Sequence, residues 1–186
     1  FSSSGENAPK IELKFKYLAT GKDTTISFRT LSDAHVIEGS TPSLLVDEML
    51  VQSGTTLQSR IYFDLSKLPD KVFINNAELI ITADTTKKIV GNSLLNGLLI
   101  GVIDELTNDS SFVPSSLYTT NLYYSGGKYS GNLTTLMRQI YATKKNLGFA
   151  LSTSNPIEGL ETFYLKNSKA AAGLRPKLII TYSKLD

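Results

Sequence analysis

The stretch SRIYFDLSKLP, residues 59–69, alternates between apolar and polar side chains. With a period of two, Ile61, Phe63 and Leu65 point to one side of a strand, and the residues between them point to the other. An apolar row of this kind is typical of a face that packs into a core, while the polar row is typical of the solvated face of an antiparallel sheet. The stretch therefore predicts a half-buried strand over residues 59–65.

Similar short segments recur along the chain and are separated by polar turns that contain glycine or proline. We expect further strands at residues 10–18, 24–31, 48–52, 77–83, 97–103, 121–125, 147–153, 162–166 and 176–183. The segment YSGGKYSGN, residues 124–132, is interpreted as a flexible turn. Many short strands joined by such turns indicate an all-β fold, an antiparallel β-sandwich, rather than an α/β sheet.

One segment has a different period. In GNLTTLMRQIYATKK, the apolar side chains are spaced as on one face of an amphipathic helix: Leu133, Leu136, Met137, Ile140 and Tyr141. Asn132 is a suitable N-cap residue. The pattern predicts one short helix over about residues 132–144.

The domain organisation predicted from the sequence is simple. Residues 1–9 are small and polar and are expected to form a flexible tail or linker. Residues 10–186 are expected to form a single sandwich domain, since a chain of 186 residues is long enough for one sizeable core. The first strand alternates apolar side chains with lysine and glutamate, so we expect one face of it to be buried.

Composition excludes several classes of function. The chain has 19 Lys and Arg against 17 Asp and Glu, and the basic residues are scattered, so we expect no nucleic-acid partner. It has no apolar run of about 20 residues, and we therefore expect no membrane span in this chain. The absence of cysteine excludes disulfides, a thiol nucleophile and thiolate metal sites. No phosphate-binding or dinucleotide-binding motif is present, and we expect no cofactor.

Several stretches resemble a known family of surface modules, the disaggregatase-related or DNRLRE domains. They are SRIYFDLSKLP (59–69), INNAELII (74–81), NLGFAL (146–151) after the expected helix, FYLKNS (163–168) and LRPKLIITY (174–182). The resemblance covers about residues 57–183. It implies a β-sandwich of jelly-roll type, of the kind grouped with carbohydrate-binding modules, although this chain lacks the tryptophan that such relatives often carry in or after the helix.

A second resemblance includes the start of the chain. DTTISF (23–28), followed by residues 44–65 and 74–81, is similar to the carboxy-terminal half of an uncharacterised family of Bacteroides-type surface lipoproteins. This resemblance implies a location at the cell surface, associated with the outer membrane, or outside the cell, with a lipid anchor in a longer precursor.

Exposed tyrosines are the candidate ligand-binding residues. Sugar rings stack on aromatic faces, while Asp and Arg side chains hydrogen-bond to sugar hydroxyls. The candidates are Arg60, Tyr62 and Asp64 on the polar face of the strand at 59–65, with Tyr118, Tyr123 and Tyr124 from the stretch LYTTNLYY. The alternative interpretation is structural: tyrosines that pack at the rim of the core, and a surface ion pair between Arg60 and Asp64.

Catalytic and metal-binding patterns are weak. His35 is the only histidine, and no nucleophile motif accompanies it. The acidic stretch DELTNDSS, residues 104–111, offers oxygen ligands without the spacing of a calcium loop. Local carboxylate pairs are Asp47 with Glu48, Asp104 with Glu105, and Glu158 with Glu161, and adjacent acids on a strand point to opposite faces. We expect no catalytic residue and no metal site.

These observations favour a non-catalytic module of the cell surface or extracellular space, which is either a glycan-binding or a structural domain of a larger lipoprotein. Its partner would be a glycan or another extracellular polymer, and we expect a monomer rather than an oligomer. Two alternatives remain. One is a polysaccharide-acting hydrolase, which would need two carboxylates that converge from distant segments. The other is an adhesin or assembly subunit completed by a partner strand.

Overall fold

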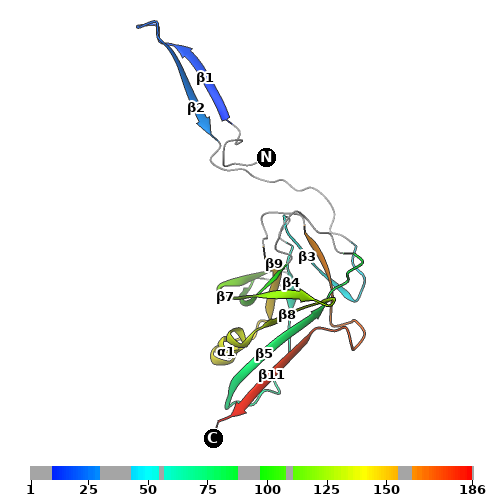
Figure 1. Cartoon of the computed structure of the whole chain (residues 1–186). Coiled ribbons are helices and arrows are strands. Elements are labelled where there is room, and N and C mark those ends of the chain that lie inside the picture. Colours follow the sequence, from blue (N-terminus) through cyan, green and yellow to red (C-terminus); the bar gives the residue numbers. More distant parts are fainter. Residues whose placement is uncertain are drawn as a thin grey trace. The chain divides into compact units, whose positions relative to one another are not determined.

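The computed structural model describes residues 10–29, 43–54, 57–87, 97–107, 111–154 and 161–185. Their contacts divide the chain into two compact units, Phe1–Thr41 and Pro42–Asp186, and each is described on its own. The sequence was interpreted as one domain from residue 10 to residue 186. Among the described residues, strands dominate both units and one short helix belongs to the second unit, which confirms the predicted all-β class (Figure 1).

The first unit contains a β-hairpin. Strand β1 (Lys10–Lys16) pairs antiparallel with β2 (Asp23–Arg29), so that Ile11 lies opposite Phe28. The predicted strand is confirmed, but the prediction that one face is buried is wrong for this unit, since Ile11 is 67% exposed and Phe28 53%. A period of two shows which side chains share a face, and a two-stranded sheet supplies no second layer to cover that face.

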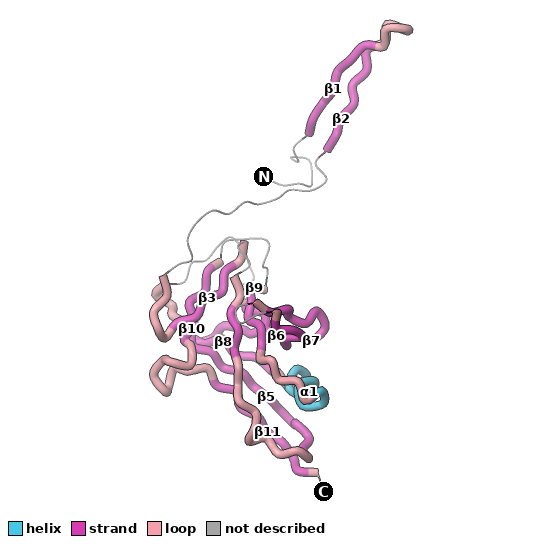
Figure 2. Tube along the Cα trace, turned by 180° about the vertical axis from the view of Figure 1, so that it is seen from behind, coloured by secondary structure: helices cyan, strands magenta, loops and turns pink. Residues whose placement is uncertain are grey.

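The second unit contains a curled antiparallel sheet and a shorter pair of strands (Figures 1 and 2). Its strands are β3 (Glu48–Gln52), β4 (Ser59–Ile61), β5 (Val72–Thr82), β6 (Leu98–Leu106), β7 (Phe112–Ser125), β8 (Lys128–Asn132), β9 (Phe149–Thr153), β10 (Thr162–Lys166) and β11 (Lys177–Lys184). Seven of them form one sheet in the order β11-β5-β8-β7-β6-β9-β4, and β10 pairs with β3. Every pairing is antiparallel, as expected for a sandwich-like fold.

The strand expected over residues 59–65 is shorter than predicted. It ends at Ile61, which pairs with the first residue of β9, Phe149. The preceding residue, Gly148, has a φ of +89°, so the partner strand does not extend further in that direction. The side-chain alternation nevertheless continues: Ile61 is buried and Tyr62 is exposed. Residues 62–65 therefore keep the predicted faces while leaving the sheet.

The turn expected over residues 124–132 is also shorter than predicted. It is confined to Gly126 and Gly127, both with positive φ, and the following residues form β8. The polar composition of KYSGN concealed this strand, in which Tyr129 is the buried aromatic residue. Gly131 is required by close packing, because a Cβ there would lie 2.6 Å from the carbonyl oxygen of Asn121.

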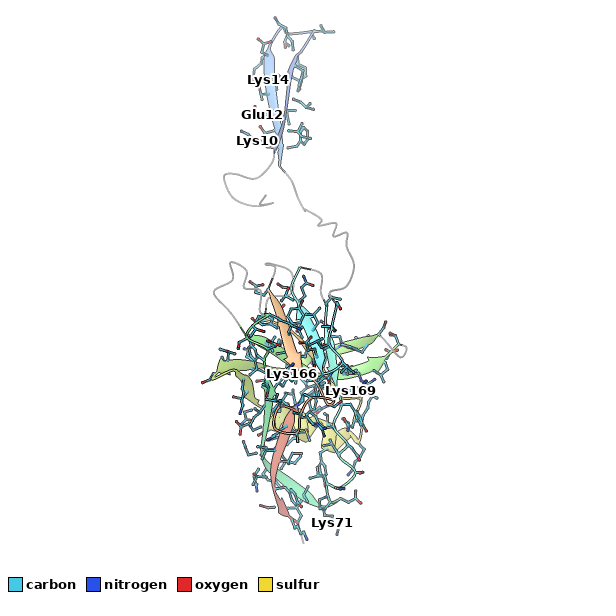
Figure 3. All side chains as sticks on the ribbon, turned by 90° about the vertical axis from the view of Figure 1, so that its right-hand side faces the viewer. Lys10, Glu12, Lys14, Lys71, Lys166 and Lys169 are labelled. Carbon is cyan, nitrogen blue, oxygen red and sulfur yellow. The ribbon has the colours of Figure 1, made fainter. Side chains whose placement is uncertain are left out.

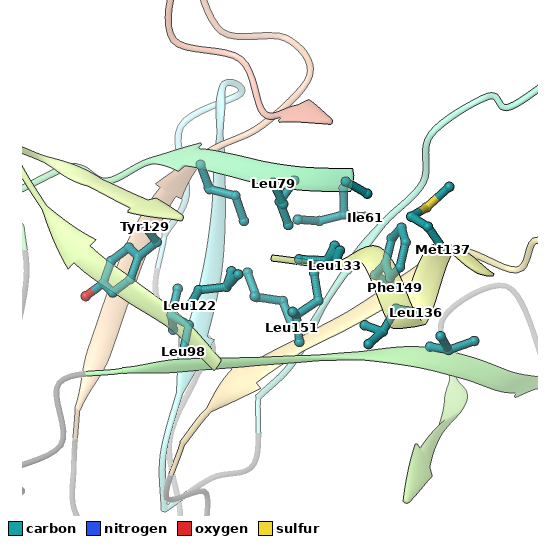
Figure 4. Close-up of a cluster of buried hydrophobic side chains, with 14 of the residues drawn as sticks. Ile61, Leu79, Leu98, Leu122, Tyr129, Leu133, Leu136, Met137, Phe149 and Leu151 are labelled. Atoms are coloured by element: carbon teal, nitrogen blue, oxygen red, sulfur yellow. The ribbon is translucent and has the colours of Figure 1, made fainter. Parts of the chain in front are cut away.

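The core is formed by the curled sheet, the β3–β10 pair and the helix α1 (Thr134–Thr143), which lies next to β5, β6 and β7 (Figure 2). The helix begins two residues after the predicted start and buries Leu136, Met137 and Ile140. Asn132 is not the N-cap residue, but its side-chain oxygen still accepts a hydrogen bond from the backbone N–H of Thr134 at 2.9 Å. Figure 4 shows Phe149 of β9 next to Leu136 and Met137. No helix in the described part of the chain has the length and apolar character needed to cross a membrane.

Candidate functional site

A groove of about 340 Å³ lies where the β4–β5 connection meets the carboxy-terminal end of α1. The connection contributes Tyr62, Asp64, Leu65, Ser66, Leu68 and Asp70, and the helix end contributes Ile140, Tyr141, Lys144 and Asn146. Ile140 is buried, Leu65 and Leu68 are partly buried against the core, and Tyr62 is 56% exposed. The groove therefore has an apolar floor and a polar, aromatic rim.

Tyr141 holds the two walls of the groove together. Its hydroxyl donates to the carbonyl oxygen of Pro69 at 3.1 Å and contacts the carbonyl oxygen of Asp70. The same hydroxyl accepts a hydrogen bond from the backbone N–H of Val72 at 3.1 Å. The amphipathic pattern of α1 places this tyrosine next to buried Ile140, so its ring packs at the edge of the core while its hydroxyl reaches the connection.

Two further polar side chains are fixed by hydrogen bonds to the backbone. The amide nitrogen of Asn146 donates to the carbonyl oxygen of Phe63 at 2.9 Å, and its oxygen accepts from the N–H of Gly148. Asp64 accepts a hydrogen bond from the backbone N–H of Ser66 at 2.9 Å. This hydrogen bond is the main reason why the pKa of Asp64 is lowered, with smaller contributions from the Ser66 hydroxyl and Lys67. Asp64 is therefore a carboxylate at neutral pH.

Lys144 lies at the end of α1 and crosses the rim of the groove. It is the C-cap residue and has a left-handed backbone with a φ of +54°. Its ammonium nitrogen lies 3.4 Å from a carboxylate oxygen of Asp70 and 4.4 Å from the centre of the Tyr141 ring. Both Lys144 and Asp70 are largely exposed, so water weakens their attraction.

Of the three residues predicted on the polar face, two line the groove. Tyr62 and Asp64 lie on its rim, whereas Arg60 is not among its lining residues. The guanidinium of Arg60 donates from Nε to the carbonyl oxygen of Leu147 at 3.0 Å, across the pairing between β4 and β9. The surface ion pair between Arg60 and Asp64 is not among the salt bridges of the described residues.

The other predicted tyrosines all lie on β7 and do not line the groove. Tyr118 is partly buried against the core, and Tyr123 is 70% exposed. Tyr124 contacts Tyr129, with ring centres 5.2 Å apart. Burial raises the pKa of Tyr129, whose hydroxyl has no hydrogen-bond partner among the described residues. The candidate residues predicted near Tyr62 and the candidate tyrosines of β7 therefore do not form one site.

A cluster of ion pairs lies elsewhere in the second unit, around Lys166 of β10 (labelled in Figure 3). Its ammonium nitrogen lies 3.0 Å from Asp47, 3.8 Å from Glu48 and 3.9 Å from Asp84, measured to carboxylate oxygens. Glu48 is buried and also pairs with Lys87 at 2.7 Å. The hydrogen bond to Asp47 is the main cause of the raised pKa of Lys166. Asp47 and Glu48 were considered above as a local pair of carboxylates. Both form ion pairs with lysine side chains.

Replacing Lys166 by methionine should lower the free energy of unfolding by about 2–3 kcal/mol near neutral pH, because buried Glu48 would keep only part of its ion pairing. Thermal or chemical unfolding measures this loss. Lys169→Met is the matched control: it removes the same charge from an exposed position and should cost less than about 0.5 kcal/mol. Equal losses for the two variants would contradict the assigned role of Lys166.

The same cluster has a defined pH dependence. The pKa of Asp84 is lowered, chiefly by a hydrogen bond from the Thr86 hydroxyl, so its contribution is present above pH 3.8 and is lost as the pH falls through the lowered pKa. The pKa of Lys166 is raised, so its contribution is present below pH 10.5 and is lost as the pH rises through the raised pKa. Lys166 adds to the lowering of the pKa of Asp84, so this part of the difference between wild type and Lys166→Met should shrink as the pH falls below 3.8.

The remaining candidate acids and the histidine are not among the described residues that line the groove. Buried Glu161 bonds to the hydroxyl of Ser53 at 2.6 Å. The backbone oxygen of Asp104 contacts the ammonium of Lys145. His35 and Glu158 lie outside the described residues, as do Asn108 and Asp109 of the acidic stretch. Within the described residues, no group of three or more His, Cys, Asp or Glu side chains is suited to hold a metal ion.

Three polar residues of the groove were not predicted from the sequence. Asp70 follows the expected strand at residues 59–65, Lys144 ends the expected helix and Asn146 lies just after it, and no local pattern connects the three. Only indirect features of the sequence pointed to this place: Tyr141 lies beside the apolar side chains of the helix, and Pro69 lies near the end of the connection. The chain matches no model of a known protein family, no curated protein and no solved structure.

Proposed function

We propose that this protein is a non-catalytic carbohydrate-binding module of a larger cell-surface or secreted lipoprotein, and that the groove at the end of α1 binds the glycan. The observation that carries this proposal is the position of Tyr62, an exposed aromatic ring beside fixed polar groups. The expected cellular location comes from the sequence alone, from the resemblance of residues 23–28, 44–65 and 74–81 to surface lipoproteins.

The chemistry of the groove suits a sugar ring. An exposed tyrosine face can stack on the C–H groups of a pyranose, and the volume of about 340 Å³ falls within the range of roughly 300–1,000 Å³ seen for small-ligand sites. Asp64 and Asp70 supply carboxylate oxygens that can accept hydrogen bonds from sugar hydroxyls. The oxygen of Asp64 is pre-oriented by Ser66, which reduces the entropy cost of binding.

A binding role fits these carboxylates better than hydrolysis. A glycosidase needs one carboxyl group with a raised pKa that can donate a proton to the leaving group. The pKa of Asp64 is lowered instead. The Asp70 side chain is 98% exposed, so no apolar pocket surrounds it. The pair is therefore suited to accept hydrogen bonds from a glycan and poorly suited to cleave it.

The replacement of Tyr62 by alanine should weaken glycan binding roughly five- to tenfold while the melting temperature stays close to that of the wild type, because the ring is exposed and contributes little to the core. A stacking tyrosine of this kind contributes about 1–1.5 kcal/mol to binding, which corresponds to this loss in affinity. Affinity gel electrophoresis on a panel of neutral polysaccharides, followed by calorimetry with the best oligosaccharide, measures the effect.

Tyr123→Ala is the matched control, since Tyr123 is an exposed tyrosine of β7 outside the groove. We expect this variant to bind like the wild type. Loss of binding in Tyr123→Ala but not in Tyr62→Ala would place the site on β7, and a silent panel would contradict glycan binding altogether. Release of reducing sugars from any polysaccharide of the panel would contradict the non-catalytic role.

A further inference from the structure

The rim of the groove already holds an ammonium group. Lys144 places its side-chain nitrogen 3.4 Å from the carboxylate of Asp70 and 4.4 Å from the centre of the Tyr141 ring. A carboxylate on one side and an aromatic face on the other form the arrangement by which proteins recognise cationic ligands. Here the position of the cation is taken by the protein's own side chain.

The position of the Lys144 ammonium affects the net charge of the groove. Its lining contains two carboxylates, Asp64 and Asp70, and one ammonium, Lys144. Without Lys144, both carboxylates and the Tyr141 ring would face the groove with no cation among the lining residues. Lys67, which acts electrostatically on Asp64, is exposed and lies outside the lining. The groove would then attract a positively charged ligand.

We propose that Lys144 determines the charge specificity of the groove: its ammonium occupies the cation position between Asp70 and Tyr141, so that the groove accepts neutral glycans and rejects amino sugars. This inference rests on the proposed carbohydrate binding. An incoming protonated amino sugar would have to displace Lys144 from both contacts and would meet its charge at short range. A neutral sugar can bind beside it through Tyr62 and Asp64.

The backbone at Lys144 makes the inference testable without unfolding the protein. With a φ of +54°, the residue has the left-handed conformation that glycine adopts most easily at the end of a helix. Lys144→Gly should therefore fold and should be at least as stable as the wild type, because the exposed ion pair that it loses contributes little. Lys144→Gln removes the charge and keeps a side chain of similar length.

The experiment compares two probes that differ in charge and share one backbone, the hexamer of N-acetylglucosamine and its fully deacetylated form. Calorimetry is carried out at about pH 5.5, where the free amines of the deacetylated hexamer are protonated. We expect the wild type to bind the neutral hexamer in preference to the cationic one. Both Lys144 variants should bind the cationic hexamer about tenfold more tightly than the wild type does, and added salt should reduce this gain.

Lys145→Gln is the control for the change in net charge, since Lys145 does not line the groove, and it should leave the preference unchanged. If the Lys144 variants bind the cationic hexamer no better than the wild type or the Lys145 variant, the inference is overturned. That result leaves the proposed function intact when Tyr62-dependent binding of neutral glycans persists. A gain in the Lys144 variants with a silent neutral panel would instead support the cation position and overturn the proposed function.

Discussion

Replacing Phe149 by alanine is expected to lower the free energy of unfolding by about 3–5 kcal/mol. Phe149 is only 1% exposed and begins β9, where it pairs with Ile61 of β4 on one side and with Val102 of β6 on the other. Its ring also lies next to the buried face of α1 (Figure 4). Truncation would leave a cavity at the point where two strands and the helix meet, and urea or thermal unfolding would measure the loss.

Phe63→Ala serves as the comparison. The sequence predicted Phe63 as a core residue, and the structure places it at the edge of the core, partly buried and in edge-on contact with Phe149 at 6.5 Å between ring centres. The expected loss is about 2 kcal/mol, smaller than that for Phe149, since less area is removed from contact. A loss at Phe63 equal to or greater than that at Phe149 would contradict this assignment of burial.

The replacement of Gly148 by alanine should cost about 3 kcal/mol or more. Gly148 has a φ of +89°, which a residue with a Cβ adopts at a cost of about 1–2 kcal/mol. A Cβ at this position would also lie 2.6 Å from the carbonyl oxygen of Ile61, which is backbone and cannot move aside without breaking the pairing between β4 and β9. Unfolding experiments on the purified variant would test this.

Gly127→Ala separates the two causes. Gly127 also has a positive φ, of +78°, but a Cβ there would meet nothing within 4 Å. Its substitution should therefore cost about 1 kcal/mol, the conformational term alone. If both glycine variants lose the same stability, the close approach of residue 148 to the backbone of Ile61 does not contribute to the loss. The proposed reason why β4 ends at Ile61 would then be wrong.

The groove shows how far sequence reasoning reached. Alternation around Ile61 correctly predicted that Tyr62 and Asp64 would be exposed, because a period of two needs no knowledge of the rest of the chain. The same alternation correctly placed Arg60 on the exposed face, but Arg60 hydrogen-bonds to the carbonyl oxygen of Leu147 and does not line the groove. Asp70 and Lys144 could not be paired from the sequence, since their contact depends on where α1 ends relative to the connection.

The sequence by itself determined the all-β class, the single amphipathic helix in the described chain and the faces of the strand that begins at Ser59. These properties follow from local periodicity and from turn-forming residues. Tertiary structure alone decided where that strand stops, since Gly148 of a distant segment ends its partner, and it alone brought Tyr62 to the end of α1. The physical reason is that packing and hydrogen bonding between remote segments depend on their positions in space, which no local pattern of side chains encodes.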